Sequence, residues 1–263
     1  MHTISTLTLT GMVLQIGIVL IWLVVAFVYA RKREHIGIKP VLIGAVVFLV
    51  FSQVLEKLLH VFMLQLNPST AAWLQNPWLY AMYGALAAGI FEELGRYVGL
   101  RWWLKQRWSF RDGVAFGLGH GGLEALLIGV VGGIQMLVLA LMYSAGTLQQ
   151  AIGGKLPAEA ADALVGQLTG ATLASFLLAG FERIPAMLLH VALSLLVLQG
   201  VRESRFRYVG YAIAAHALID FFPALYQKQM LSLATVEILL LLVGIGSVLF
   251  IRNAKRQALK RPV

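Results

Sequence analysis

Long apolar runs are the feature that most constrains what this chain can fold into. Between stretches of polar, Pro or Gly residues, seven such runs can be marked, at about 9–30, 41–64, 78–100, 112–144, 171–199, 207–225 and 231–251. A helix needs about 20 apolar residues to cross a bilayer, and 59% of the residues are hydrophobic while only 13% are charged. The sequence therefore predicts an all-α polytopic integral membrane protein with about seven transmembrane helices. We expect residues 1–263 to form a single transmembrane domain.

Basic residues are concentrated in alternate loops. One set of loops and the C-terminal tail carry Arg31, Lys32, Arg33, Lys39, Arg101, Lys105, Arg107, Arg111, Arg202, Arg205, Arg207, Arg252, Lys255, Arg256, Lys260 and Arg261. The opposite loops carry Lys155 and Lys228. Because basic loops stay on the cytoplasmic side, the N-terminus is predicted to face outward and the C-terminus the cytoplasm. Residues 145–170 then form an outer loop, and a bacterial cytoplasmic membrane is the expected location.

Composition also limits the partners and cofactors. The chain has no cysteine, so a metal ion would have to be bound by His, Asp or Glu. The basic residues behind the net charge of +9 lie mainly in the loops predicted to be cytoplasmic. Membrane topology therefore accounts for the charge, and nucleic acid is not expected as a partner. The expected partners are the lipid bilayer and a peptide or protein substrate within or beside it. The sequence gives no oligomeric state.

Four ionisable residues lie at similar depths in separate predicted spans. Counting from the cytoplasmic ends, Glu92, His120, His190 and His216 each lie eight to ten residues inside. At 1.5 Å per residue this is about 12–15 Å below the surface. Ionisable groups are costly inside a membrane and mark functional sites there. The common depth predicts one polar site inside the helical bundle.

Helical spacing gives these residues neighbours one turn away. Three pairs are four residues apart, Glu92 with Arg96, His120 with Glu124, and His216 with Asp220. His120 and His216 therefore each have a carboxylate one turn away, which could orient the imidazole or bind the same metal ion. Small residues recur beside His120, at Gly113, Gly117 and Gly121, and such a ridge lets another helix approach closely.

These residue types fit metal-dependent hydrolysis. Three protein ligands with one open position are typical of catalytic zinc, and a nearby carboxylate can deprotonate the bound water. We expect His120, His190 and His216 to bind a divalent metal, with zinc favoured. Glu92 is the predicted general base, although Glu93 could take that role; Glu93 and Arg96 are predicted to give electrostatic support. Glu124 and Asp220 are predicted to orient the ligands or to bind the metal themselves.

The chain resembles a known group of membrane proteases through three motifs. They are Glu92-Glu93-Leu-Gly-Arg96, Phe116-Gly-Leu-Gly-His120 and His216-Ala-Leu-Ile-Asp220. They resemble the CAAX-protease and bacteriocin-processing clan of intramembrane metalloproteases, which also includes PrsW-like proteases and the APH subunit of gamma-secretase. Within it the chain is most similar to YhfC-type membrane peptidases, through Gly-His-Gly-Gly-x-Glu at 119–124. The resemblance covers about residues 85–220, within the predicted core helices at 78–225.

The resemblance implies an intramembrane metal-dependent peptidase. Glu92 would activate water, while His120 and His216 would bind or orient the metal and the oxyanion. Two features depart from the CAAX-type pattern: Arg96 comes one residue earlier than usual, and His190 and Glu124 lie outside the short motifs.

Two other functions would use the same residues. A transporter or channel could use them to carry protons or divalent cations, but the paired broken helices of a carrier are not visible in the sequence. A non-catalytic scaffold of the APH kind is made less favourable by the double Glu. Elsewhere, His60 is expected to hydrogen-bond between helices, and Glu182 to pair with Arg183.

Overall fold

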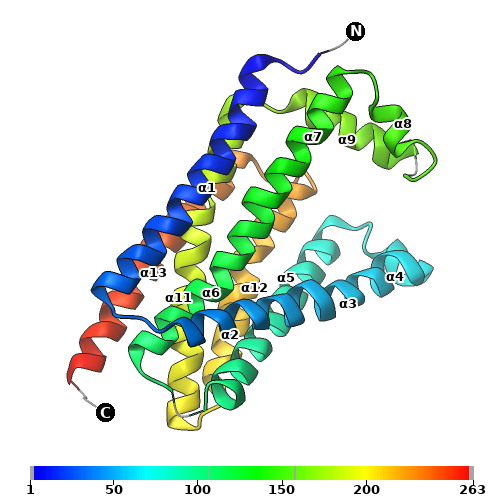
Figure 1. Cartoon of the computed structure of the whole chain (residues 1–263). Coiled ribbons are helices and arrows are strands. Elements are labelled where there is room, and N and C mark those ends of the chain that lie inside the picture. The colour runs from blue at the N-terminus through cyan, green and yellow to red at the C-terminus, as the bar shows by residue number, and fades with distance from the viewer. Residues whose placement is uncertain (1–2, 106, 157, 261–263) are drawn as a thin grey trace. The chain divides into compact units, whose positions relative to one another are not determined.

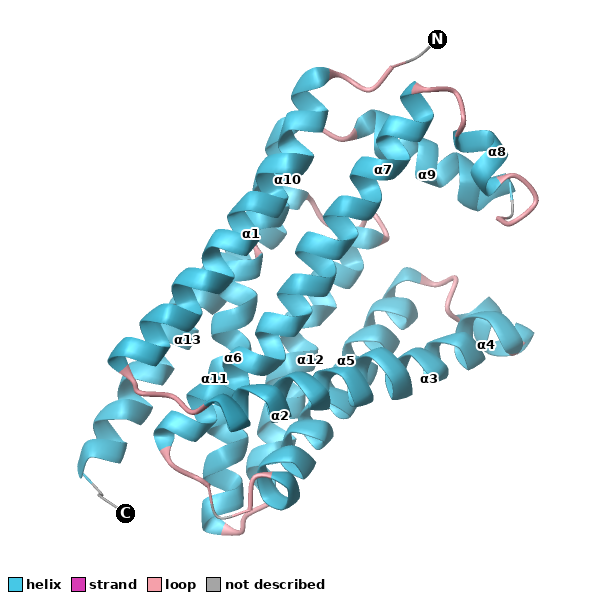
Figure 2. Ribbon diagram, viewed as in Figure 1, coloured by secondary structure: helices cyan, strands magenta, loops and turns pink. Residues whose placement is uncertain are grey.

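The computed structural model describes residues 3–105, 107–156 and 158–260. Within these residues the regular elements are all helices, and no strand occurs (Figure 2). The predicted all-α fold is confirmed.

The helices follow one another as labelled in Figure 1. The first half of the chain contains α1 (Thr6–Arg33), α2 (Ile38–Phe48), η1 (Leu49–Glu56), α3 (Lys57–Val61), η2 (Phe62–Leu66), α4 (Pro68–Trp73), α5 (Pro77–Val98), η3 (Gly99–Trp103), α6 (Phe110–Ala125) and η4 (Leu126–Val131). The second half contains α7 (Gly132–Ser144), α8 (Leu148–Ile152), α9 (Ala158–Gly170), α10 (Leu173–Phe181), α11 (Arg183–Glu203), α12 (Arg207–Gln227) and α13 (Leu233–Lys260). The η elements are π-helical and continue neighbouring α-helices.

Six helices of the described chain are long and apolar enough to cross a membrane. They are Thr6–Arg33, Ile38–Leu66, Phe110–Ser144, Leu173–Glu203, Arg207–Gln227 and Leu233–Lys260. The predicted span 78–100 corresponds to α5, which has 22 residues. Its C-terminal half contains three charged residues, Glu92, Glu93 and Arg96. The count of seven spans and the orientation stay predictions.

In the predicted span 112–144, the pair Gly132-Gly133 favours a kink or a break in the helix. The chain stays helical across Gly132 and Gly133, and the irregularity is the π-helical η4 immediately before them. The stretch 145–170 contains the short helices α8 and α9.

The chain forms two compact units. The first comprises Met1–Val25 with Glu124–Ile184, and the second comprises Ala26–Leu123 with Pro185–Val263. In the first unit, Met12, Ala140, Leu168 and Phe176 belong to the apolar core. In the second, Val47, Phe116, Val197 and Val209 belong to the largest apolar core, which joins α2, α6, α11 and α12.

The close approach of α6 and α11 in the second unit depends on glycine. A Cβ atom at Gly117 would lie 2.5 Å from Val191 Cα, and one at Gly121 would lie 2.9 Å from His190 Cβ. Real Cβ atoms do not come this close to neighbouring atoms, so only glycine fits. The predicted role of the small-residue ridge is confirmed, and it brings His190 beside the helix that carries His120.

Candidate metal centre

Three ionisable residues of α5 begin the site. Asn76 caps this helix by accepting hydrogen bonds from the backbone N–H groups of Trp78 and Leu79. Glu92, Glu93 and Arg96 are all buried, the last two completely. Arg96 Nε lies 3.0 Å from Glu93 Oε2, and Arg96 Nη2 lies 3.8 Å from Glu92 Oε2. One guanidinium therefore contacts both carboxylates.

Three buried imidazoles from three other helices surround the Glu92 carboxylate. His120 belongs to α6, His190 to α11 and His216 to α12. Glu92 Oε2 lies 2.8 Å from His120 Nε2, 3.8 Å from His190 Nδ1 and 3.9 Å from His216 Nε2. The ring centroid of His190 lies 5.0 Å from that of His120 and 5.6 Å from that of His216. The structure thus brings together the four residues that share one predicted depth.

A subset of this cluster has the geometry of a metal site. Among the described residues, Glu92, His120 and His190 each offer a ligand atom, and these atoms lie within 4.8 Å of one another. One carboxylate oxygen and two imidazole nitrogens are a ligand set found in catalytic zinc sites. All three side chains are buried. The donor types and spacing fit a divalent metal ion.

The charge balance of the cluster also favours a cation. Glu92 and Glu93 bring two carboxylates into the cluster, and the guanidinium group of Arg96 contacts both. Carboxylates gathered in a buried site are stabilised by nearby positive charge. A divalent cation would therefore add to the positive charge that Arg96 supplies.

His216 is held differently from the other two imidazoles. Its Nδ1 lies 2.8 Å from Glu93 Oε1, and its Nε2 lies 3.3 Å from Asp220 Oδ2. Both ring nitrogens thus face carboxylates from opposite sides. The Asp220 side chain is 38% exposed, whereas that of Glu92 is 8% exposed. Asp220 therefore connects the buried cluster with its surface.

Sequence reasoning missed Ser194. This residue of α11 is completely buried, and its hydroxyl accepts a hydrogen bond of 2.8 Å from Arg96 Nη1. It donates one of 2.7 Å to the backbone oxygen of His190. The signal was present in the spacing, because Ser194 lies four residues after His190 and shares its helix face.

Glu124 belongs to the first unit. There its Oε1 lies 3.5 Å from Arg183 Nη1, and Arg183 Nη2 lies 3.4 Å from Glu182 Oε2. The expected pairing of Glu182 with Arg183 is confirmed, while a role for Glu124 in metal binding stays a prediction.

His60 makes the interhelical contact expected of it. Its Nδ1 lies 2.7 Å from the hydroxyl of Tyr83 on α5, and its Nε2 lies 3.1 Å from Glu56 Oε1 one turn earlier on its own helix.

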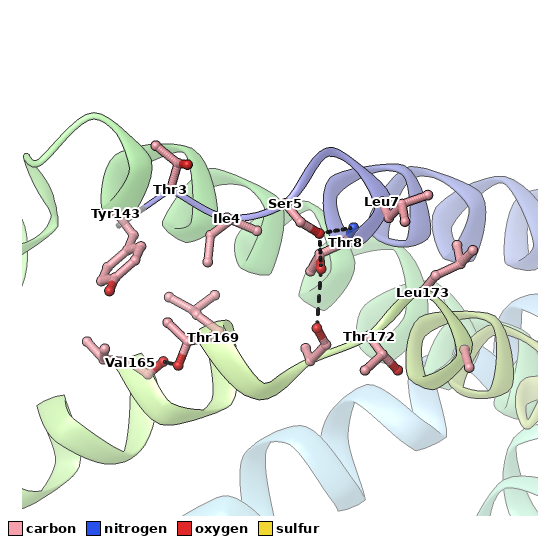
Figure 3. Close-up of a pocket in the computed structure, with 13 residues that line it drawn as sticks. Thr3, Ile4, Ser5, Leu7, Thr8, Tyr143, Val165, Thr169, Thr172 and Leu173 are labelled. Atoms are coloured by element: carbon pink, nitrogen blue, oxygen red, sulfur yellow. Dashed lines mark hydrogen bonds between the residues drawn. The ribbon is translucent and has the colours of Figure 1, made fainter. Parts of the chain in front are cut away.

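The first unit contains a separate open pocket of about 910 Å³ (Figure 3). Hydroxyl and apolar side chains line it, including Ser5, Thr8, Thr169 and Leu173. Its described lining includes the phenol of Tyr143 and contains no carboxylate or imidazole.

The helices and the buried cluster define a class, the polytopic membrane proteins with a Glu/His/His group that could hold a metal inside the helices. Residues 17–241 match the model of the YhfC intramembrane metalloprotease family. The chain belongs to this family. It is 39% identical to the membrane protein YhfC of Bacillus subtilis (strain 168) over 230 residues, which are 87% of this chain and 89% of that protein. No solved structure matches the chain.

Proposed function

We propose that this protein is an intramembrane metal-dependent peptidase that hydrolyses a peptide bond of a substrate within or beside the bilayer. The observation that carries the proposal is the convergence of Glu92, His120 and His190 from three helices into a buried group with metal-ligand spacing. Membership of a metalloprotease family supports it. We further propose one transmembrane domain in a bacterial cytoplasmic membrane, with the N-terminus outside.

Glu92, His120 and His190 would hold the divalent metal, for which zinc is the favoured candidate because of the mixed N and O donors. When bound, the metal would supply Lewis acidity, which polarises a peptide carbonyl and acidifies water. The glycines of α6 support this role, since they let α11 carry His190 close to His120.

The contacts of His216 support a role in proton transfer. Glu93 faces Nδ1 of its ring and fixes the ring orientation, while Nε2 faces Asp220 and Glu92. An imidazole oriented by a carboxylate can take up a proton and return it during hydrolysis. Glu93 would also hold Arg96 through its second oxygen. Asp220, the most exposed of these groups, would exchange protons with the surface.

Metal content and cleavage, measured on the same variants, test these roles. Glu92→Gln is expected to weaken Zn²⁺ binding by more than about 100-fold. Loss of a residue that only hydrogen-bonds to a metal ligand costs up to about 100-fold, and loss of a ligand should cost more. His216→Gln is expected to keep the metal and to lower cleavage by about 10²–10⁴-fold. Cleavage would be measured on fluorogenic transmembrane peptides in liposomes, and metal content by mass spectrometry of purified protein.

The outcomes separate the possible roles of Glu92. If Glu92→Gln keeps a full equivalent of metal but loses cleavage, Glu92 is the general base rather than a ligand. If His216→Gln loses the metal, His216 is a ligand, as its sequence position first indicated. If the unaltered protein binds no divalent metal, the proposed function is wrong.

A further inference from the structure

The guanidinium group of Arg96 lies among the proposed metal ligands. Its Nη2 is 3.0 Å from His190 Nδ1, 3.4 Å from His120 Nε2 and 3.8 Å from Glu92 Oε2. These are atoms of the same three side chains that form the metal-ligand group. A positively charged nitrogen therefore lies beside all three side chains.

Arg96 Nη2 and a metal ion cannot both bind Nδ1 of His190 at the same time. Arginine only donates hydrogen bonds, so in the 3.0 Å contact Nδ1 of His190 must be the acceptor. An imidazole nitrogen has one lone pair in the ring plane, and a metal at about 2.0–2.1 Å would need that lone pair. The hydrogen bond from Arg96 and a bond to the metal are thus mutually exclusive at this nitrogen.

The other end of the guanidinium group is fixed by α11. Arg96 Nη1 donates to the backbone oxygen of His190 at 2.9 Å and to the hydroxyl of Ser194 at 2.8 Å. Ser194 itself is held, because its hydroxyl donates to the same backbone oxygen. Since the guanidinium is planar and rigid, fixing Nη1 also fixes the direction in which Nη2 points.

We infer that Arg96 and a divalent metal ion compete for His190, and that Ser194 is a positioning residue that holds Arg96 in the competing orientation. The inference rests on the proposed metal site. Metal binding at Nδ1 of His190 then requires Nη2 to withdraw from that nitrogen, while the ion pair of Arg96 Nε with Glu93 can persist. The free energy of metal binding is then the contribution of the ligands, reduced by the free energy needed to break this hydrogen bond.

Two substitutions test the competition without changing the charge of the site. Ser194→Ala removes the hydroxyl that holds Nη1. Arg96→Lys keeps the positive charge beside Glu93, but one ammonium group cannot reproduce the forked contacts of a guanidinium. Each is expected to raise the affinity for Co²⁺ and Zn²⁺ by about tenfold, the scale of one hydrogen bond to a charged group. If charge alone mattered, neither variant would change the affinity.

A matched control is available on another helix. Ser247 of α13 is also a buried serine, 5% exposed, so Ser247→Ala removes a buried hydroxyl elsewhere in the same unit. It should leave metal affinity unchanged. His190→Ala should abolish metal binding, alone or combined with Ser194→Ala or Arg96→Lys, because it removes a proposed metal ligand.

Co²⁺ titrations of the full-length protein in detergent provide the readout, since visible absorption reports the ligand geometry as well as the affinity. Tighter binding in both variants with an unchanged cobalt spectrum supports the competition. Equal affinity in the unaltered protein and both variants overturns it and leaves the proposed function standing. Failure of the unaltered protein and all variants to bind Co²⁺ or Zn²⁺ overturns both. Damage to the fold would weaken binding, so it cannot imitate the expected gain.

Discussion

At the scale of single residues, Glu93 has the most restrictive surroundings in the cluster. It is completely buried, and its two oxygens contact Arg96 Nε at 3.0 Å and His216 Nδ1 at 2.8 Å. It thereby joins the residue that competes for His190 to the residue proposed for proton transfer. A carboxylate in this position serves the fold as well as the site.

Glu93→Gln is therefore expected to lower the free energy of unfolding by about 3–5 kcal/mol, the usual cost of removing one partner of a buried ion pair. Thermal unfolding in detergent measures the change. Glu203→Gln is the control, because Glu203 pairs with Arg205 at 3.5 Å and accepts hydrogen bonds from Gln199 and Tyr208 at an exposed position, where such contacts contribute little. Equal unfolding temperatures for the two variants would contradict a structural role for Glu93.

At the scale of elements, the site depends on the distance between α6 and α11. Each helix carries one proposed metal ligand, and the glycine ridge sets their separation. A change at the ridge should therefore affect stability and metal binding together, even where no ligand is altered.

Gly117→Ala tests this coupling. The added Cβ would lie 2.5 Å from Val191 Cα and 2.9 Å from His190 O, so the helices must separate, at a cost of about 1–3 kcal/mol. Metal affinity should fall at the same time because His190 moves with its backbone. Gly210→Ala is the matched control, since no atom lies within 4 Å of its Cβ, and it should stabilise the protein by about 0.5–1 kcal/mol. Unchanged metal binding in Gly117→Ala would show that the helix separation does not control the site.

Much of this arrangement could be predicted from helical periodicity. Counting residues from the span ends predicted that Glu92, His120, His190 and His216 meet, because helical rise is nearly constant. The glycine spacing predicted a close helix contact for the same reason. Both predictions use only backbone geometry, which the sequence pattern encodes directly.

Side-chain directions could not be predicted in the same way. The rotamer of Arg96 places one nitrogen against Ser194 and another against His190, and nothing in the spacing of α5 specifies that choice. The division of roles between His190 and His216 likewise depends on ring orientation, which turns Nδ1 of His216 toward Glu93 and Nδ1 of His190 toward Arg96. The π-helical segments also lack a sequence signal of their own.

At the scale of the whole molecule, the predicted orientation follows from where the basic residues lie. The absence of native cysteine makes every introduced cysteine a unique label. Gln149 on α8 and Gln257 on α13 are both exposed, and the predicted topology puts them on opposite sides of the membrane.

In intact cells, a membrane-impermeant maleimide should label Gln149→Cys and should label Gln257→Cys only after the membrane is opened. The physical reason is that basic flanking residues are retained on the cytoplasmic side. A cysteine-free parent is the control for background labelling. The reverse labelling pattern would show that the predicted orientation is wrong and that the C-terminal tail lies outside.

The exposure of Asp220 has a consequence for how the cluster meets its surroundings. Its side chain is 38% exposed, yet it lies 3.3 Å from a histidine that is almost fully enclosed. Of the two carboxylates closest to the His216 ring nitrogens, Asp220 is therefore the accessible one, whereas Glu93 is fully enclosed. The ring of His216 thus stands at the boundary between the enclosed part of the cluster and its one accessible carboxylate.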